Sequence, residues 1–258
     1  MSSAREAAGS AARTYSPIVE LRQYTLHPGA RDVLIELFDR EFVETQEALG
    51  IEVIGQFRTP DDPDRFIWLR GYRDMASRAH ALAAFYGGPA WKTHREAANA
   101  TMLDSDNVLL LRPARADSAF TISSSARPAP GARETPRTLI AATIYYLRAP
   151  AEEGFAEFFE RTIRPTVIRA GAAVLASFVT DNLPNNFPAL PVREGERVFV
   201  SFLGFADLAG YEAHLASLAG SVSWNREIAR ELERHIERAP ERWRLLPTAR
   251  SWLGSTVR

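Results

Sequence analysis

An internal repeat limits the folds open to this chain more than any other property of its sequence. The stretch WLRGYRDM at 68–75 returns as FLGFADL at 202–208, and both carry Gly, an aromatic residue, one further residue and Asp. The shift of 133 residues that aligns them also pairs Trp91 with Trp224. Self-similarity at a long period indicates that one supersecondary unit occurs twice. We therefore predict a duplicated architecture.

The first copy reads as strand, helix, strand, strand, helix, strand. Alternating side chain types indicate a strand at 18–26, a turn at 27–29 leads into an amphipathic helix, and Gly50 takes the position just beyond that helix. The remaining elements are predicted as strands at 51–59, 65–72 and 107–113, a helix from Asp74 to about Tyr86 and a helix over about 90–101.

The second copy follows the same order at a shift of 121 residues, which becomes 133 after a longer hairpin loop at 181–196. We expect this loop to cover a barrel mouth or reach a neighbouring subunit. The last helix is predicted over 225–238. The expected domains are a disordered tail at 1–17, a first unit at 18–113, a linker at 114–137 and a second unit at 138–250.

Each β-α-β-β-α-β unit predicts a four-stranded antiparallel sheet with helices on one face, the ferredoxin-like arrangement. The other face would be bare and apolar, so it must be covered. A second copy of the unit is the nearest cover. The predicted fold class is α+β, with two tandem ferredoxin-like units that form a pseudo-dimeric α/β barrel.

Composition excludes several classes of function. Lys and Arg number 31 against 32 Asp and Glu, so the chain has no basic field to hold nucleic acid. The absence of cysteine excludes disulfides, thiolate catalysis and cysteine-bound metals. We expect no membrane span and no apolar leader, and we take the cytoplasm as the default location. Homo-oligomer formation is left open.

The segment VELRQYTLHPG at 19–29, the strand with FRT at 57–59 and WLRGYRDM, with a Trp 17 positions past the Asp, together resemble the NIPSNAP family. The resemblance is strong over 18–113 and diverged over 138–248. It implies a fold of the dimeric α/β-barrel superfamily, whose members include cofactor-independent monooxygenases, haem-degrading enzymes and isomerases. It implies no particular reaction, because a fold hosts many functions.

A polar row on the first strand is the strongest candidate site. Glu20, Arg22 and Tyr24 lie at alternate positions and therefore share one face. Val19 and Leu21 take the other face, which we expect to pack on the helices, so the polar row should face the opposing sheet. Neighbouring strands are expected to add Arg58, Trp68 and Arg70. Such a cluster suits a carboxylate or an enolate.

The alternative is a structural ion network that fixes how the halves dock. In the second copy Glu20 and Arg22 become Ala141 and Thr143, and only the tyrosine remains, as Tyr145. A structural cluster at a pseudo-symmetric interface would be expected on both sides. The one-sided row therefore favours specialisation, although drift after duplication explains it nearly as well.

The histidines show no spacing typical of a metal site, so we predict no metal and no cofactor. His94 is kept as a candidate general base or axial haem ligand because it lies one turn after Trp91. Trp91 and Trp224 are expected to pin helices to their sheets, with a pocket wall shared by Phe57, Phe85 and Tyr86 as the alternative.

Two functions remain open on these observations. In the first, the protein binds a small aromatic or anionic metabolite in a barrel or sheet–helix pocket, and whether it acts as a cofactor-independent enzyme, monooxygenase-like or isomerase-like, is left open. Tyr24 and His94 are its candidate catalytic residues, and its candidate ligand-binding residues are Glu20, Arg22, Arg58, Trp68, Arg70 and Tyr145. In the second, the protein is a non-catalytic interaction module whose interior charges are structural. An enclosed pocket would favour the first and a filled interior the second.

Overall fold

A computed structural model describes residues 13–14, 16–122 and 127–254 of the chain. It contains the predicted β-α-β-β-α-β order twice. The first unit consists of β2 (Ile18–Leu26), α1 (Arg31–Leu37), the π-helical turn η1 (Phe38–Phe42), α2 (Val43–Glu47), β3 (Glu52–Arg58), β4 (Arg65–Tyr72), α3 (Met75–Gly87), α4 (Pro89–Asn99), β5 (Met102–Asp104) and β6 (Val108–Pro113). The second consists of β8 (Leu139–Leu147), the 3₁₀ turn η2 (Ala151–Glu153), α5 (Phe155–Phe158), η3 (Phe159–Ile163), α6 (Arg164–Arg169), β9 (Ala173–Thr180), β10 (Val198–Phe205), α7 (Leu208–Ala219), η4 (Trp224–Ile228), α8 (Ala229–His235) and β11 (Ile236–Pro247).

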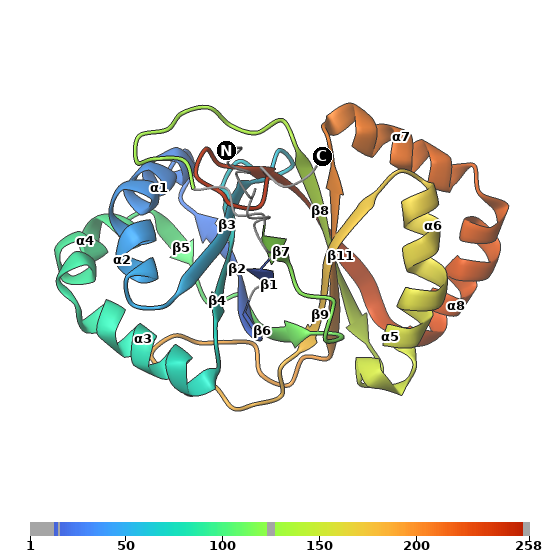
Figure 1. The fold of residues 1–258 in the computed structure, drawn as a ribbon, viewed down its shortest axis with the longest axis horizontal. Coiled ribbons are helices and arrows are strands. Elements are labelled where there is room, and N and C mark those ends of the chain that lie inside the picture. Colours follow the sequence, from blue (N-terminus) through green and yellow to red (C-terminus); the bar gives the residue numbers. More distant parts are fainter. Residues whose placement is uncertain (1–12, 15, 123–126, 255–258) are drawn as a thin grey trace, which may run out of the picture.

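Strands from both units close into one antiparallel barrel (Figure 1). Within the described residues the order around it is β2, β4, β3, β11, β8, β10, β9, β6 and back to β2. Two seams join the units. At one, Leu111 of β6 faces Thr180 of β9, and at the other Leu246 of β11 faces Arg58 of β3. The predicted pseudo-dimeric α/β barrel is confirmed.

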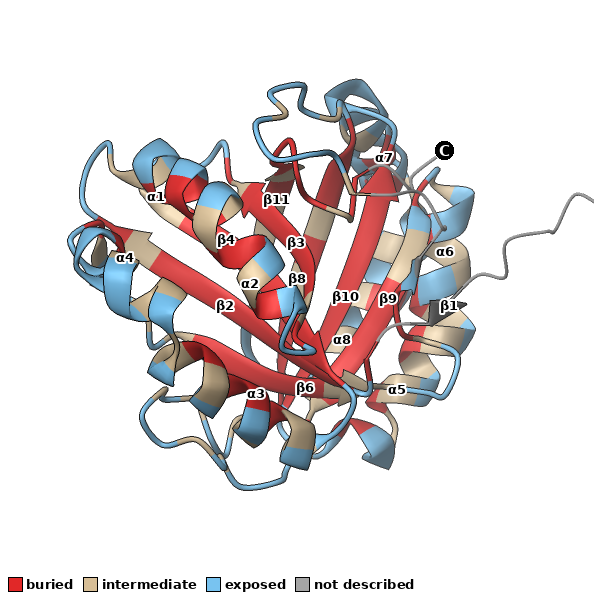
Figure 2. Ribbon diagram, turned by 60° about the vertical axis from the view of Figure 1, so that its left-hand side comes forward, coloured by how far each residue is buried: buried red, intermediate tan, exposed pale blue. Residues whose placement is uncertain are grey.

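The barrel interior is a packed apolar core, and its strands are buried along most of their length (Figure 2). Val19 and Leu21 of β2 point into it. The ring of Phe202 lies 5.0 Å from that of Phe120 and 6.0 Å from that of Phe178, centroid to centroid. Leu253 joins the same core from the C-terminal segment. This packing stabilises the fold, and side chains occupy the barrel interior.

Helices cover the barrel on two opposite sides, α1 to α4 for the first unit and α5 to α8 for the second (Figure 1). Local chemistry explains where several begin and end. The carboxylates of Asp74 and Asp207 cap α3 and α7 by accepting from the backbone N–H three residues on. Gly50 and Gly171 follow α2 and α6 with φ of 83° and 94°, the left-handed conformation that glycine adopts without strain.

Three segments differ from their sequence-based prediction. The last helix ends at His235 rather than at 238, because Ile236 pairs with Leu147 and the chain continues as β11. In the segment predicted as a linker, β7 (Thr121–Ile122) pairs with β1 (Arg13–Thr14), and Phe120 enters the barrel core. Residues 13–14 thus form a strand within the predicted tail, whereas 1–12 and 15 lie outside the described residues. Tertiary pairing has overridden local pattern in each case.

A polar network holds the C-terminal segment against η1 and α2. Arg250 is 1% exposed, and its guanidinium donates to the Asp39 and Pro128 carbonyl oxygens and to the Glu44 carboxylate. The Asp39 carboxylate accepts from Gln56 Nε2 at 2.8 Å. Burial raises the pKa of Asp39 to about 6, against the opposing charges of nearby arginines. The protein therefore carries an acid that is costly to ionise.

Asp39→Asn should stabilise the protein in a pH-dependent way. Because the folded pKa lies above the ordinary value of 3.8, stability contributed by Asp39 is present at low pH and lost as the pH rises towards 6. Asparagine keeps the acceptor for Gln56 and removes the charge. We expect a gain of about 1–2 kcal/mol in unfolding free energy at pH 8 and none near pH 4. Thermal unfolding at the two pH values measures it, and an equal gain at both would contradict this explanation.

Candidate functional site

The polar row of β2 lies beneath the helices of the first unit and not inside the barrel. Glu20, Arg22 and Tyr24 lie on the strand face opposite to Val19 and Leu21, which belong to the interior core. The predicted orientation towards the opposing sheet was therefore wrong. The interior, enclosed by both sheets, is the more apolar compartment and takes the aliphatic face of the strand. The polar row is left to the sheet–helix layer.

Glu20 is the centre of a cluster of three arginines. Its Oε2 accepts from Arg22 Nη1 and Arg70 Nε, both at 2.7 Å, and its Oε1 accepts from Arg78 Nε at 2.6 Å. Strand register explains the first contacts, because Glu20 of β2 faces Arg70 of β4. Arg78 comes from α3 and was not predicted. A signal was present, since Arg78 shares an i, i+3, i+4, i+7 stripe with apolar residues Ala81, Leu82 and Phe85.

The cluster is fully buried and carries excess positive charge. The side chains of Glu20, Arg22, Arg70 and Arg78 are each at most 1% exposed. Burial alone would raise the pKa of Glu20, but the charges of Arg70, Arg22 and Arg78 hold it well below its usual range. One carboxylate thus faces three permanent cations. The net charge of about +2 is unusual for a volume that solvent does not reach.

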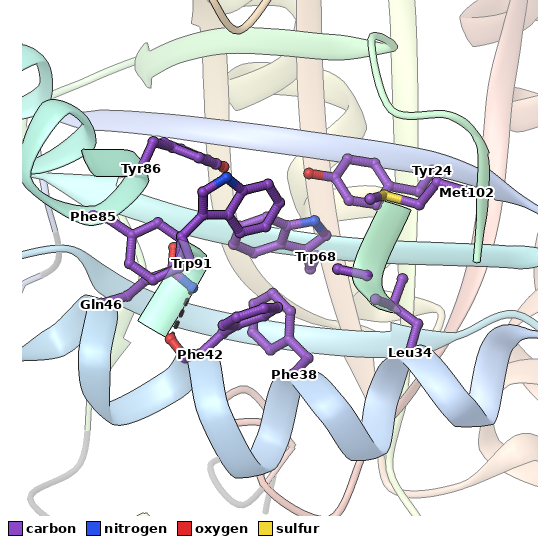
Figure 3. Close-up of a pocket in the computed structure, with 11 residues that line it drawn as sticks. Tyr24, Leu34, Phe38, Phe42, Gln46, Trp68, Phe85, Tyr86, Trp91 and Met102 are labelled. Atoms are coloured by element: carbon purple, nitrogen blue, oxygen red, sulfur yellow. Dashed lines mark hydrogen bonds between the residues drawn. The ribbon is translucent and has the colours of Figure 1, made fainter. Parts of the chain in front are cut away.

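An aromatic pocket adjoins the cluster between the sheet and the helices (Figure 3). Its lining residues are Tyr24, Leu34, Phe38, Phe42, Gln46, Trp68, Phe85, Tyr86, Trp91, Ala98 and Met102. The cavity volume is about 30 Å³, which is room for one or two water molecules. Tyr86, Trp91 and Met102 are only partly buried, so the outer wall consists of the side chains most free to move. Trp91 is thus both a packing residue and a pocket wall, whereas Phe57 lies in the barrel core.

Two tyrosine hydroxyls supply polarity to this apolar pocket. Those of Tyr24 and Tyr86 point towards each other across it (Figure 3). Tyr24 Oη accepts from Arg22 Nε at 2.9 Å, and Tyr86 Oη accepts a longer contact of 3.5 Å from Arg70 Nη1. Because each oxygen accepts from a guanidinium, each phenolic proton is free to be donated elsewhere. Burial raises the pKa of Tyr24, so this group remains a phenol and a donor at neutral pH.

The loop at 181–196 crosses from the second unit to the first and covers the cluster. It runs along the lower edge of the molecule from β9 towards α3 (Figure 1). Asn185 Oδ1 and Asn186 Oδ1 accept from Arg78 Nη1 at 3.0 and 2.8 Å, and Phe187 stacks on Tyr86 at 6.0 Å between ring centroids. The loop therefore reaches the other half of its own chain, where a barrel mouth or a neighbouring subunit was expected.

The remaining predicted site residues lie apart from the cluster. Arg58 is at the surface, where Nε contacts Asp32 Oδ1 at 2.9 Å. His94 Nε2 lies 3.3 Å from Glu41 Oε2, outside the pocket lining. Tyr145 belongs to the core of the second unit, against Phe155. No group of three metal-ligating side chains occurs in the described part of the chain.

The second unit shows the same framework without the charges. Its strand register is equivalent, since Ala141 faces Leu203 as Glu20 faces Arg70. At the position of Arg78 on α3, α7 has Tyr211. The corresponding layer of the second unit is an apolar cluster that includes Ala141, Tyr145 and Leu203. The fold therefore forms without an ion cluster at this place, which makes the charges of the first unit a local addition.

Comparison with solved structures shows the same fold over the whole chain. A candidate monooxygenase from Lactobacillus acidophilus has a TM-score of 0.53 at 13% identity, covering 90% of this chain and 94% of its own. A candidate monooxygenase from Fusobacterium nucleatum has 0.54 at 13%, covering 91% and 93%. An anthrone oxidase-like protein has 0.54 at 11%, covering 93% and 96%. At these identities the likeness concerns the fold alone.

Sequence comparison finds a family that is similar to the first unit. A search of curated protein sequences gave no match. Within the described ranges, no helix has the length and apolar character needed to cross a membrane. The family model of NIPSNAP matches residues 19–116, which contain β2 from its second residue, β3 to β6, the whole Glu20 cluster and the aromatic pocket. Residues 19–116 are therefore similar to the NIPSNAP family, and the chain as a whole has an α/β-barrel fold.

Proposed function

We propose that the protein binds a small aromatic metabolite in the sheet–helix pocket of its first unit, with an oxygen of the ligand held by Tyr24 and Tyr86. The observation that carries this proposal is the pair of hydroxyls facing each other inside an aromatic lining. Each hydroxyl contacts an arginine of a cluster with net positive charge. Aromatic walls with few convergent polar groups are typical of small-molecule sites.

Chemically, the arrangement suits an oxygen on which negative charge develops. Two phenol donors backed by buried cations would stabilise an enolate or a phenolate, and they need no reorganisation when the charge appears. An aromatic ketone with an acidic C–H bond next to its carbonyl group is the simplest ligand of this class. Proton removal from such a ketone is a step that isomerases and cofactor-independent oxygenases share. In the described barrel core, which is mainly apolar, the hydroxyl of Tyr146 is already bonded to Glu241 and Arg193.

Because the pocket is small, a ligand can enter it only by displacing part of its wall. A ring cannot fit into about 30 Å³, so binding must displace the partly buried outer wall. Trp91 and Met102 lie in that wall. Gln46, whose Nε2 donates to the Phe42 carbonyl oxygen at 3.0 Å, belongs to the fully buried part of the lining. Opening is therefore expected on the side of α4.

Acetophenone, an aromatic ketone, tests the site against ethylbenzene, which lacks the oxygen. Wild-type protein should bind acetophenone more tightly by calorimetry, and Tyr24→Phe and Tyr86→Phe should each weaken this binding about tenfold, the effect of one lost hydrogen bond. Melting temperatures should change by less than about 3 °C. Tyr145→Phe, the matched change in the second unit, should leave binding unchanged. Equal binding of the two compounds, or an equal loss in Tyr145→Phe, would contradict the proposal.

A further inference from the structure

The Glu20 cluster contains more positive than negative charge. Arg22, Arg70 and Arg78 carry permanent positive charges, and Glu20 supplies one negative charge at a depth where no side chain exceeds 1% exposure. Uncompensated buried charge is strongly unfavourable, and arginine does not escape it by losing a proton. The tyrosines and asparagines around the cluster are neutral. A folded protein with this cluster therefore has a place for a further negative charge.

Unused donors show where that place is. Nη2 of Arg70 and Nη2 of Arg78 are both buried, and neither has a hydrogen-bond partner among the described residues. The hydroxyl of Tyr72, on β4 two residues from Arg70, is also buried without a partner. Buried donors are almost always satisfied in native proteins. Three buried donors without a partner around one ion cluster indicate a site for an acceptor with more than one oxygen.

The amide oxygens that accept from Arg78 can be displaced by a ligand. Its acceptors on Nη1 are the amide oxygens of Asn185 and Asn186, which are neutral and come from a loop of the other unit. Asn186 is exposed and Asn185 is half-buried, so this side of the cluster lies one residue from solvent. The other partner of Arg78, Glu20, is a charged group deep in the layer. Neutral amide oxygens from a surface loop thus occupy the position beside Arg78, where a carboxylate would bind more strongly.

We propose that Arg70 and Arg78 form a carboxylate subsite beneath the loop at 181–196, in which the ligand's carboxylate displaces the Asn185 and Asn186 amides. This proposal extends the proposed function and rests on it for the position of the ligand's aromatic ring. Since Arg70 also contacts Tyr86 of the pocket wall, a carboxylate here would belong to an aromatic acid whose ring lies in the pocket. The second unit, with Leu203 and Tyr211 at the two arginine positions, has no such subsite.

Formate, benzoate and benzyl alcohol separate the subsite from the pocket. Thermal unfolding of the wild-type protein at constant ionic strength should show stabilisation by formate, larger stabilisation by benzoate and little by benzyl alcohol. If formate and benzoate have no effect while acetophenone still binds, the subsite is refuted and the proposed function stands. If formate stabilises and acetophenone does not bind, the subsite stands and the proposed function fails.

Asn186→Asp tests the location without removing an arginine. The change is nearly isosteric and places a carboxylate 2.8 Å from Arg78 Nη1, so the variant carries its own anion. We expect its melting temperature to exceed that of the wild type and its apparent Kd for formate to rise at least tenfold. Asn182→Asp, in the same loop but without a contact to Arg78, should behave as the wild type. Formate binding of wild-type strength in Asn186→Asp, or equal losses in both variants, would overturn the proposal.

Discussion

Glu20→Ala is expected to lower the free energy of unfolding by about 3–5 kcal/mol, because it leaves three guanidiniums buried without a carboxylate. For a chain of this size that corresponds to a fall in melting temperature of roughly 6–20 °C. The pKa of Glu20 lies far below its usual range, so the contribution is present throughout the neutral range and is lost progressively as the pH falls below the ordinary value of 4.5. Thermal or urea denaturation measures the change.

The second unit provides the control for this experiment. A variant with all four charged side chains replaced by their counterparts should recover most of the lost stability, since an apolar layer is often as stable as a buried ion cluster. The four changes are Glu20→Ala, Arg22→Thr, Arg70→Leu and Arg78→Tyr. We expect this variant to fold and to lose formate and acetophenone binding. If it is no more stable than Glu20→Ala, the cluster contributes to stability in a way that an apolar layer cannot replace, and the specialised role is wrong.

Phe202→Ala should produce a loss of similar size for a different reason. Phe202 is fully buried in the barrel core, in contact with the rings of Phe120 and Phe178. Truncating it removes apolar burial and leaves a cavity, at a cost of about 3–5 kcal/mol. Leu208→Ala, at a residue that is 45% exposed, should change stability by less than about 0.5 kcal/mol.

Ligand binding distinguishes the two compartments. Under conditions where Phe202→Ala remains folded, it should bind acetophenone as the wild type does, because the pocket lies on the other face of the sheet. Tyr24→Phe should show the reverse, with weak binding and normal stability. Loss of binding in Phe202→Ala would place the ligand inside the barrel and contradict the proposed site.

The architecture was predictable because its signals are local and occur twice. Asp74 and Asp207 cap helices wherever they precede one, and Gly50 and Gly171 end helices through their own conformational freedom. Such effects depend on a few neighbouring residues. The same holds for strand alternation, which correctly grouped Glu20 with its two neighbours on one face.

The site was only partly predictable because it depends on contacts distant in sequence. Alternation defines two faces of β2 but does not say which one turns inwards, and both faces here are buried. Arg78 reaches Glu20 from another element, and Asn186 reaches Arg78 from the other unit. Phe187 joins them by stacking on Tyr86. No periodicity within one segment carries information of this kind.

The seam between β11 and β3 has a consequence for biosynthesis. It pairs Leu246 with Arg58, so the barrel cannot close until residue 246 has left the ribosome. Until then the free edge of β3 is open to pairing with other nascent chains, a known hazard of sheets with distant partners. The loop that covers the arginines also emerges late. The arginines of the nascent first half therefore remain hydrated until the second half has been translated.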